Sequence, residues 1–488
     1  MKSLQALWSA TPAAHAAIPV SAIVIDSRAV HSGVLFVALR GITRDARDLI
    51  PDAIRAGAAA VFAEQGDAWL DSTVIDGVPV IVVPHLAQEL GGIASRFYGE
   101  PSQHLDVLAV TGTNGKTSVA NLAAGALVQL GRHAGVLGTL GNGLFGHLEK
   151  STHTTLDALL LQDMLARFVD RGADSVALEA SSHGLVQGRL NGTAIDVAIF
   201  TNLTRDHLDY HGNMDSYAAA KSLLFRWPTL KAAVINVDDA AGARYAADIA
   251  PGVRLLRYSQ QAATDADIRA LSVKPTLAGL AIQVATPEGE CALEVPLLGR
   301  FNVSNLLAVL GGLMALGLPL ADVAAALRQA RPVPGRMEAF HGKHPTVVVD
   351  YAHTPDALEK VLSSLREHAQ GHLVCVFGCG GDRDAGKRPE MGAIASRLAD
   401  HVVVTSDNPR SEDPAVIIAQ IMEGAGKGAH VEADRRVAIR KAILAAGQND
   451  IVLVAGKGHE DYQEIAGVRH PFSDVHEVRS AVAQWRAA

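Results

Sequence analysis

The sequence predicts an α/β protein of three domains, and three observations indicate this class. At 488 residues the chain is longer than one ordinary hydrophobic core supports. Short apolar segments of strand length alternate with helical patterns, which is typical of parallel sheets covered by helices. The 45 glycines and an aromatic content of only 5% favour closely packed helices and sheets over an all-β architecture.

The first domain is predicted to span residues 1–98 as a small α/β unit. Its strands are expected at 22–25, 35–39 and 80–83, with an amphipathic helix at 53–60 between them. The next stretch turns polar and contains Gly99, Pro101 and Ser102, which indicates a domain boundary.

The central domain is predicted to span residues 99–333 around a parallel, ATPase-like sheet. A buried strand at 107–110 leads into a glycine-rich turn and a helix at 118–130, which Gly131 ends as a C-terminal cap. Further strands are expected at 175–178, 197–200 and 233–236. The most apolar run, 306–321, is too short to cross a membrane and predicts a buried helix.

The third domain, residues 334–488, is predicted to be a Rossmann-like α/β unit. Two prolines and a glycine within 331–335 stop the preceding helix and mark the boundary. Strands are expected at 346–349, 373–377, 401–404 and 451–454, with helices between them.

Composition excludes several classes of partner and compartment. The formal net charge of −8 disfavours nucleic acid as an electrostatic partner. Cys291, Cys375 and Cys379 are odd in number and irregularly spaced, so we expect buried thiols in a reducing compartment. The N-terminus lacks the continuous apolar core of a signal peptide, and no segment is long enough to span a membrane. We expect a cytoplasmic protein that works as a monomer.

The loop between the first central strand and its helix carries the clearest functional signal. The residues Gly112, Thr113, Asn114, Gly115, Lys116 and Thr117 stand where a phosphate-binding loop is found. Its glycines let backbone N–H groups surround phosphate oxygens, while Lys116 can neutralise terminal phosphates and Thr117 can bind Mg²⁺. The general nucleotide pattern has a further glycine where this chain has Val110. By itself the loop leaves motor, kinase, GTPase and ligase open.

Acidic and histidine residues follow at the ends of later strands. Glu179 comes directly after a strand, where a carboxylate can bind Mg²⁺. The stretch 206–211 holds two aspartates and two histidines, and without a nearby cysteine it favours the hard cation Mg²⁺ over zinc. Lys221 falls on a helix predicted at 218–225, and its residue context alone is that of a snorkelling surface lysine.

In order along the chain, these motifs resemble those of the Mur ligases of peptidoglycan synthesis. Within that family they are most similar to the branch that joins meso-diaminopimelate to UDP-N-acetylmuramoyl-L-alanyl-D-glutamate. The matching stretches span nearly the whole chain: 26–28, 111–117, 179–189, 202–212, 299–302, 334–336, 350–355, 380–389, 407–410 and 456–460.

The resemblance implies that the three domains hold, in order, the uridine nucleotide, ATP and the incoming amino acid. It assigns catalysis to Lys116, Glu179, His207 and Lys221. Lys221 falls where the family carries a carbamylated lysine, whose anion would bind a second Mg²⁺ beside His207, while Thr117 and Glu179 would bind the first. Residues matched to ATP contacts are Gly112, Thr113, Asn114, Gly115, Lys116, Thr117, Ser118, Asn302, Arg336 and Asp350. Those matched to the UDP-muramoyl dipeptide are Ser27, Thr154, Thr155, Ser181, Gln187 and Arg189.

The loop Asp407-Asn408-Pro409-Arg410 resembles the family's diaminopimelate-selecting motif. The far end of diaminopimelate is a zwitterion, so Arg383 and Arg410 can hold its carboxylate, while Asp407, Asn408 and Glu460 can accept from its ammonium. Gly456 is matched to the same site. Lysine lacks that carboxylate and would leave the arginines unpaired, which predicts its rejection.

The implied reaction passes through an acyl phosphate, formed when the D-glutamate γ-carboxylate attacks ATP. Two departures from the family pattern fall on uridine-substrate contacts, at His153 and at residues 41–44. Three alternatives are weaker. A folylpolyglutamate synthetase or another Mur ligase lacks the motifs at 26–28 and 407–410. An oxidoreductase would need a third glycine after 377–381. A regulatory ATP-binding module would not need Glu179, His207 and Lys221 together.

Overall fold

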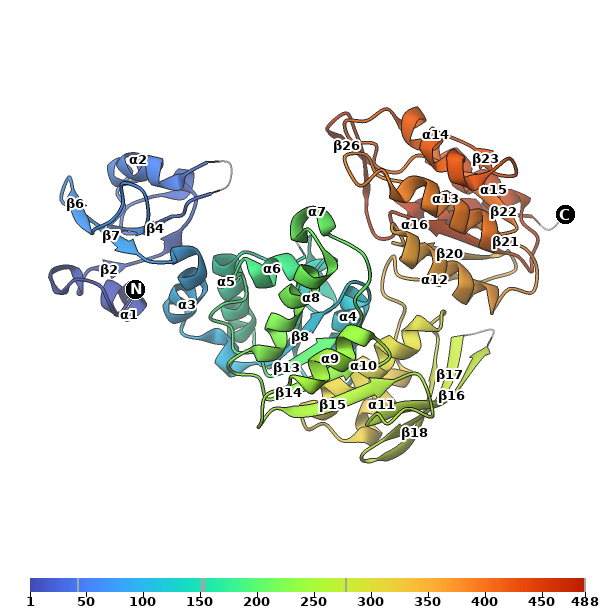
Figure 1. Ribbon diagram of the computed structural model, residues 1–488, viewed down its shortest axis with the longest axis horizontal. Coiled ribbons are helices and arrows are strands. Elements are labelled where there is room, and N and C mark those ends of the chain that lie inside the picture. The colour runs from blue at the N-terminus through green and yellow to red at the C-terminus, as the bar shows by residue number, and fades with distance from the viewer. Residues whose placement is uncertain (42–43, 151–153, 277–278, 487–488) are drawn as a thin grey trace.

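The computed structural model describes residues 1–41, 44–150, 154–276 and 279–486, arranged as three parts that each have their own sheet (Figure 1). The N-terminal part is blue, the central part runs from cyan to yellow, and the C-terminal part is orange to red. The expected departure at His153 and the middle of the departure at 41–44 lie outside the described residues. The boundaries at 98/99 and 333/334 stay predictions.

The N-terminal part is built on a five-stranded sheet in the order β3-β4-β5-β7-β6. Its elements are β1 (Lys2–Ser3), α1 (Leu4–Leu7), β2 (Pro19–Val20), β3 (Ile23–Val24), β4 (Leu35–Ala38), α2 (Ile50–Arg55), β5 (Ala60–Glu64), β6 (Thr73–Ile75), β7 (Val78–Val83) and α3 (Leu86–Tyr98). The helix predicted at 53–60 is wrong in its second half. The helix ends at Arg55, Gly57 turns the chain at a φ of +101°, and the apolar residues from Ala60 pair as a buried strand between β4 and β7.

The central part contains an eleven-stranded sheet in the order β11-β10-β9-β12-β8-β13-β14-β15-β16-β17-β18. Its strands are β8 (Asp106–Thr111), β9 (Ala134–Gly138), β10 (Gly141–Leu144), β11 (His147–Glu149), β12 (Ser175–Glu179), β13 (Val197–Phe200), β14 (Ala232–Asn236), β15 (Arg254–Ser259), β16 (Ile268–Thr276), β17 (Gly279–Thr286) and β18 (Gly289–Val295). Its helices are α4 (Lys116–Gln129), α5 (Ala158–Asp170), α6 (Ser182–Val186), α7 (Leu208–His211), α8 (Met214–Ser222), α9 (Ala240–Ala247), α10 (Phe301–Ala315) and α11 (Leu320–Arg328).

The predicted parallel sheet forms the middle of this larger sheet. The strands expected near 107, 175, 197 and 233 are confirmed, and the sheet is parallel from β9 to β16. At both edges it continues with antiparallel strands that the alternating helix and strand pattern does not predict. The apolar run 306–321 is buried up to Met314 and partly exposed beyond it, and it is not a single helix, because Gly317 at a φ of +84° and Pro319 separate α10 from α11.

The C-terminal part has a six-stranded sheet in the order β19-β20-β24-β21-β22-β23. Its elements are β19 (Glu338–Phe340), β20 (Thr346–Asp350), α12 (Pro355–Arg366), β21 (Leu373–Phe377), α13 (Lys387–Leu398), β22 (His401–Val404), α14 (Pro414–Ala425), β23 (His430–Val431), α15 (Arg435–Ala445), β24 (Ile451–Ala455), β25 (Tyr462–Ile465), β26 (Val468–Pro471) and α16 (Asp474–Gln484). The strands predicted here are confirmed, and Cys375 and Cys379 are buried thiols as expected, while Cys291 is half-buried.

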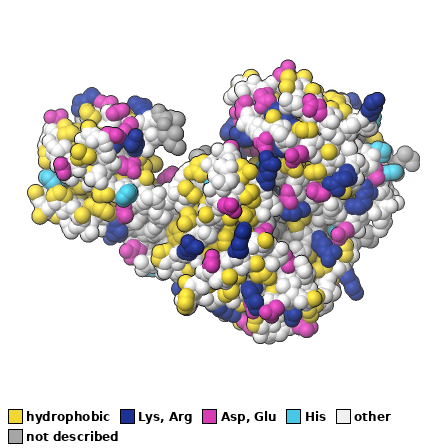
Figure 2. Space-filling view, viewed as in Figure 1, with side chains coloured by type: hydrophobic (Ala, Val, Ile, Leu, Met, Phe, Trp, Pro, Cys, Tyr) yellow, Lys and Arg dark blue, Asp and Glu magenta, His cyan; other side chains and the backbone are white. Residues whose placement is uncertain are grey.

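The two parallel sheets decide where the functional loops lie. Loops leave the carboxyl ends of β8, β12 and β13 in the central part and of β21, β22 and β24 in the C-terminal part, where ligands of open α/β sheets bind. Figure 2 shows a recess on this face of the molecule, above the central part and between the two outer parts. In the described residues no helix is long and apolar enough to cross a membrane.

Candidate functional site

The phosphate loop is a rigid turn between β8 and α4. Gly112 and Gly115 have φ angles of +152° and +87°, and an added Cβ on Gly112 would run into the Thr201 hydroxyl. The Thr113 N–H donates to Asn202 O at 2.8 Å, and the Thr201 hydroxyl donates to Asn114 O at 2.6 Å. The end of β13 therefore fixes the shape of the loop.

Val110 explains why the loop lacks the outer glycine of the general pattern. It is fully buried within β8 and pairs with Ile199 of β13 and Glu179 of β12. Because the strand continues to Thr111, the turn begins only at Gly112, and a glycine two residues earlier has no turn to serve. The short loop is a consequence of a longer strand.

Lys116 begins α4 and turns back over the loop. Its Nζ donates to the carbonyl oxygens of Gly112 and Thr113, both at 2.9 Å, and burial lowers its pKa. Thr117 and Ser118 follow in the first turn of the helix, and both are buried. The cation and the helix N-terminus thus face the same space at the carboxyl end of β8.

Glu179 lies at the end of β12 with 1% of its surface exposed. Its carboxylate accepts from the Thr117 hydroxyl at 3.0 Å and from the Thr139 N–H at 2.8 Å. Among the described lysines and arginines none forms an ion pair with it. A buried carboxylate held only by neutral donors is costly without a cation, and a divalent ion fits that requirement.

Lys221 lies on α8 with 1% of its surface exposed, so the snorkelling interpretation is wrong. Its Nζ donates to Gly112 O at 2.8 Å and lies 4.4 Å from the centre of the Tyr217 ring. Burial holds its pKa well below the usual value, and the charge of Lys116 lowers it further. A buried amine without a carboxylate partner is stabilised in the neutral form.

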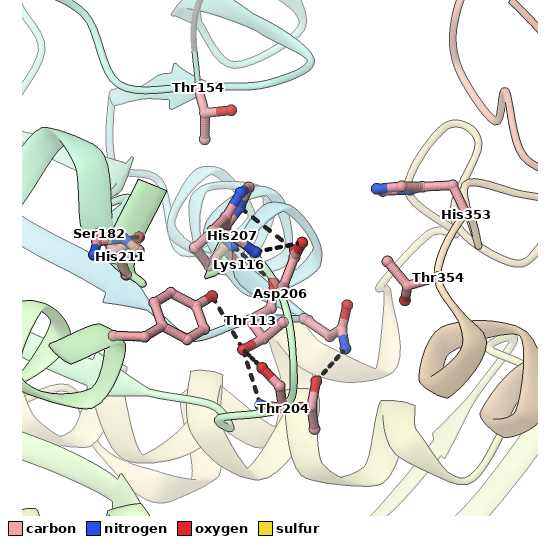
Figure 3. A network of polar contacts seen from close by, with 12 residues as sticks. Thr113, Lys116, Thr154, Ser182, Thr204, Asp206, His207, His211, His353 and Thr354 are labelled. Carbon is pink, nitrogen blue, oxygen red and sulfur yellow. Dashed lines mark hydrogen bonds and ion pairs between the residues drawn. The ribbon is translucent and has the colours of Figure 1, made fainter. Parts of the chain in front are cut away.

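His207 lies close to Lys116 and Asp206, as the close view in Figure 3 shows. It has a φ of +54°, and its ring Nε2 is 3.4 Å from the carboxylate of Asp206. The His183 ring is 4.9 Å from the His207 ring, and His211 bonds Ser182 at 2.9 Å. Within the described residues, no three His, Cys, Asp or Glu side chains are grouped closely enough to form a metal site by themselves.

Five of the six residues matched to the UDP-muramoyl dipeptide lie together at the end of β12. Arg189 donates to Thr155 O at 2.8 Å and to Gln187 Oε1 at 2.9 Å, and the Thr155 hydroxyl donates to Ser181 Oγ at 2.9 Å. Thr154 joins them through Thr139, which in turn contacts Glu179. The sixth residue, Ser27, begins a short 3₁₀ turn in the N-terminal part that Asp26 caps.

The residues matched to the far side of ATP come from two parts of the chain. Asn302 is buried in α10, where its amide donates to Leu298 O at 2.8 Å. Asp350 ends β20 and accepts from the N–H groups of Met337 and Ala352, both at 2.8 Å, while burial raises its pKa. Arg336 stacks on the Tyr351 ring at 4.2 Å.

A polar contact joins the phosphate loop to the C-terminal part. The Asn114 side chain donates to Asp356 at the start of α12 at 3.1 Å. In Figure 3, His353 and Thr354 of the same segment lie across from Lys116 and His207. The first turn of α12 therefore borders the site.

The loop 407–410 follows β22 and packs against the loops after β21 and β24. Gly381 N–H donates to Asn408 O at 2.9 Å, and Arg410 Nη1 donates to Gly381 O at 2.6 Å. Asn408 Nδ2 donates to Glu460 Oε2 at 2.8 Å, and an added Cβ on Gly456 would run into Asp407. Arg383 is exposed nearby on the β21 loop. The structure thus brings all residues matched to diaminopimelate into one group of three loops.

The glycines at 378 and 381 do not open a dinucleotide turn. An added Cβ on Gly378 or Gly381 would meet the backbone oxygen of Thr405 or Pro409. These glycines allow the β21 loop to approach the 407–410 loop backbone to backbone.

Several residues that shape the site are not predicted from the sequence. Thr201 and Asn202 shape the phosphate loop, Thr139 holds Glu179, and Asp356 reaches Asn114. Lys457 lies inside a matched stretch, directly after Gly456, and its position in a glycine-flanked loop at a strand end is a signal of the kind that identified Lys116.

Comparison with known proteins agrees with this arrangement. Residues 19–98 match the profile described as Mur ligase family, catalytic domain, residues 110–313 match the Mur ligase middle domain, and residues 335–458 match the Mur ligase glutamate ligase domain. The chain is 51% identical over 478 residues to a protein of Pseudomonas aeruginosa named UDP-N-acetylmuramoyl-L-alanyl-D-glutamate--2,6-diaminopimelate ligase, covering 97% of each. A protein of Chromobacterium violaceum with the same name is 50% identical, covering 96% of this chain and 95% of that protein.

Solved structures are similar over the same length. A structure of a UDP-N-acetylmuramoyl-L-alanyl-D-glutamate--2,6-diaminopimelate ligase, 41% identical, has a TM-score of 0.75 and covers 99% of both chains. The MurF ligase of Thermotoga maritima, 18% identical, has a TM-score of 0.63, covers 96% of this chain and 97% of its own, and shares the fold. With three family profiles in order and relatives about half identical over almost the whole length, the chain belongs to the Mur ligase family.

Proposed function

We propose that this chain is an ATP-dependent ligase that joins meso-diaminopimelate to the D-glutamate γ-carboxylate of UDP-N-acetylmuramoyl-L-alanyl-D-glutamate, with ADP and phosphate as by-products. The names of the most similar relatives support this substrate pair. The observation that carries the proposal is the loop 407–410, which lies against Glu460 and places charges of both signs together. One chain supplies all the assigned residues, and the cytoplasm supplies ATP.

The phosphate loop is assigned to the terminal phosphates of ATP. Its backbone N–H groups and the first turn of α4 surround the phosphate oxygens, and Lys116 exchanges its two carbonyl acceptors for them. The attacking carboxylate and the γ-phosphate are both anions, so this cation lowers their repulsion in the transition state. Asn302, Arg336 and Asp350 are assigned to the rest of the nucleotide across the junction of the two parts.

Glu179 and Thr117 are assigned to Mg²⁺. The burial of Glu179 and its hydrogen bond with Thr117 support this assignment. A carboxylate without a cationic partner, next to a hydroxyl, offers the oxygen ligands that a hard cation prefers. When bound, Mg²⁺ supplies positive charge to the phosphates during transfer. Thr139 keeps the carboxylate oriented from its other side.

Lys221 is assigned to carbamylation. A neutral amine nitrogen forms a bond with the carbon of CO₂ and loses a proton, which turns the uncharged side chain into an anion. Burial without a carboxylate partner supplies the neutral amine, and its position beside Gly112 O places the new anion at the phosphate loop. With His207 nearby, this anion would hold a second Mg²⁺.

Arg189, Ser181 and their neighbours are assigned to the UDP-muramoyl dipeptide. Arg189 is held by Thr155 O and Gln187, so its guanidinium is oriented before an anionic group arrives. Ser27 is assigned to the uridine end in the N-terminal part. The D-glutamate γ-carboxylate then takes the γ-phosphoryl group, and the diaminopimelate amine displaces phosphate from the acyl phosphate.

The amino-acid site is assigned by charge. Arg383 and Arg410 are assigned to the distal carboxylate of diaminopimelate, and Asp407 and Glu460 to its ammonium. Asn408 is already engaged on both sides of its amide, so we assign it to holding Glu460 in place of accepting from the substrate. Pro409 and Gly456 shape the loops around these groups.

The test is an ADP-release assay with the UDP-muramoyl dipeptide that compares meso-diaminopimelate with L-lysine. We expect turnover with diaminopimelate and at least about a hundredfold lower kcat/KM with lysine, because lysine leaves two arginines unpaired. Equal rates would overturn the specificity, and no ADP release with either amino acid would overturn the proposed reaction.

A further inference from the structure

A second buried lysine lies in the amino-acid site, on the loop that follows β24. Lys457 has 0% of its surface exposed and is flanked by Gly456 and Gly458, with φ angles of +119° and +54°. Its Nζ donates to Asn408 Oδ1 at 2.8 Å and to Glu460 Oε2 at 2.9 Å. It therefore links two of the three loops that form the site.

These contacts determine which polar atoms of Asn408 and Glu460 can still bind a ligand. Asn408 Oδ1 also accepts from the Glu464 N–H at 3.0 Å, and its Nδ2 donates to Glu460 Oε2. Glu460 Oε2 thus receives two donors, whereas no hydrogen bond from a described residue reaches its Oε1. The Glu460 side chain is 16% exposed, so Oε1 is the corner that a substrate can reach.

The charges around Lys457 fall into an inner pair and an open set. Arg435 and Asp474 have completely buried side chains and bind each other at 2.6 Å, so their charges offset one another, although Arg435 also lies 4.0 Å from the Asp407 carboxylate. The open set consists of two carboxylates, Asp407 and Glu460, and three cations, Lys457 with the arginines assigned to the substrate carboxylate. Lys457 therefore gives this set one more positive than negative charge.

We propose that Lys457 is a positioning residue that makes this pocket select a zwitterionic side-chain end over a cationic one. It holds Glu460 in an orientation that leaves one carboxylate oxygen free. Its positive charge also offsets one of the two negative charges, those of Asp407 and Glu460, that would otherwise attract any ammonium. A zwitterion brings a carboxylate that balances the excess positive charge, whereas a bare ammonium adds to it. The inference rests on the proposed function, because the zwitterion is the distal end of diaminopimelate.

The test is kcat/KM for meso-diaminopimelate and for L-lysine in the wild type and in Lys457→Met. We expect the variant to lower the preference for diaminopimelate about tenfold or more, through a higher KM for diaminopimelate and an equal or better use of lysine. KM for ATP and for the UDP-muramoyl dipeptide should not change. The matched control is Lys441→Met, which removes an exposed lysine of the same part that pairs with Glu432.

A second variant predicts the opposite change and keeps the test decisive if Lys457→Met does not fold. Glu460→Gln keeps both acceptor contacts of the side-chain oxygen but leaves the charge of Lys457 unopposed, so lysine use should fall more than diaminopimelate use. A parallel loss of both amino acids in both variants would overturn the role of Lys457 and leave the proposed function intact. A wild type that turns over neither amino acid would overturn both.

Discussion

Two lysines with almost no exposed surface, Lys221 in the central part and Lys457 in the C-terminal part, have different kinds of partner. Lys221 in the central part has carbonyl oxygen and an aromatic ring as neighbours, whereas Lys457 in the C-terminal part has a carboxylate and an amide oxygen. In the first case burial favours the neutral amine, which is the form that can react with CO₂. In the second case Glu460, on the same loop as Lys457, supplies the opposite charge.

The difference shows that the partners of a buried lysine, more than its burial, indicate what it does. An amine whose hydrogen-bond acceptor is uncharged is suited to covalent chemistry, and an ammonium paired with a carboxylate is suited to fixing that carboxylate. Both lysines lie at the carboxyl edge of a parallel sheet, so the fold alone does not distinguish them.

The largest effect that would test this contrast is expected at Lys221. Lys221→Ala should lower ADP release by about 10³-fold at saturating substrates, because the variant lacks the amine that we propose to carry the carbamate anion. Added bicarbonate should not restore activity, since alanine has no amine to react with CO₂. The measurement is steady-state ADP release with and without bicarbonate, alongside Lys441→Met. Full activity of Lys221→Ala would remove the carbamate from the mechanism.

Much of the fold is predictable because its strands are short, apolar and separated by clear helices. Strand β13 is predicted with its bounds, and β21 and β22 likewise. The antiparallel strands β16 to β18 were missed because they are partly exposed and carry polar residues, as in the exposed end of β16. The end of α2 is not predicted because the alanine-rich residues 56–60 suit a helix locally, whereas Gly57 at a φ of +101° turns the chain and Ala60 already pairs with neighbouring strands in β5.

The site was predictable where its residues are close in sequence and less so where they are not. The loop 112–117 can be recognised from its own residues. Why it lacks the outer glycine is explained only by the structure, in which Val110 pairs with Glu179 as part of strand β8. The burial of Lys221 could not be predicted from its helix, because Gly112, its acceptor, is 109 residues away. Lys457 lies 49 residues from Asn408, so its role depends on how β22 and β24 are placed in the sheet.

A smaller effect on stability is expected at Gly335, where the segment between the central and C-terminal parts approaches the loop that carries Lys457. Gly335 has a φ of +65°, and an added Cβ would collide with the backbone of Gly458 and His459. Gly467 in the same part has a φ of +76° but no atom near its Cβ. Gly467→Ala should lower the Tm of this part by about 2–4 °C through backbone strain of about 1 kcal/mol.

Gly335→Ala should lower the Tm by about two to four times as much, because about 1–3 kcal/mol of overpacking adds to the same strain. It should also raise KM for diaminopimelate, since the displaced loop carries Lys457 and Glu460. Thermal unfolding and steady-state kinetics of the two variants give both quantities. Equal Tm values for Gly335→Ala and Gly467→Ala would contradict the close approach of the linker and the loop.

The smallest effect is expected at an exposed ion pair, the opposite extreme to the buried lysines. Asp26 accepts from Arg28 Nη2 at 2.7 Å, and side-chain and backbone hydrogen bonds from Arg28 lower its pKa to about 2. A lowered folded-state pKa stabilises the fold above the unfolded value of about 3.9, and this contribution is lost as pH falls toward 2. Because both side chains are solvent-exposed, screening keeps the effect on stability small.

Arg28→Ala should therefore raise the pKa of Asp26 toward its usual value without a measurable loss of fold at neutral pH. The remaining backbone N–H of residue 28 still donates to the carboxylate, so part of the shift should persist. An NMR titration of the Asp26 carboxyl carbon in wild type and variant measures this change. An unchanged pKa would mean that the backbone cap, and not the guanidinium, controls the turn that presents Ser27, whereas a full return to the usual value would assign that control to the arginine alone.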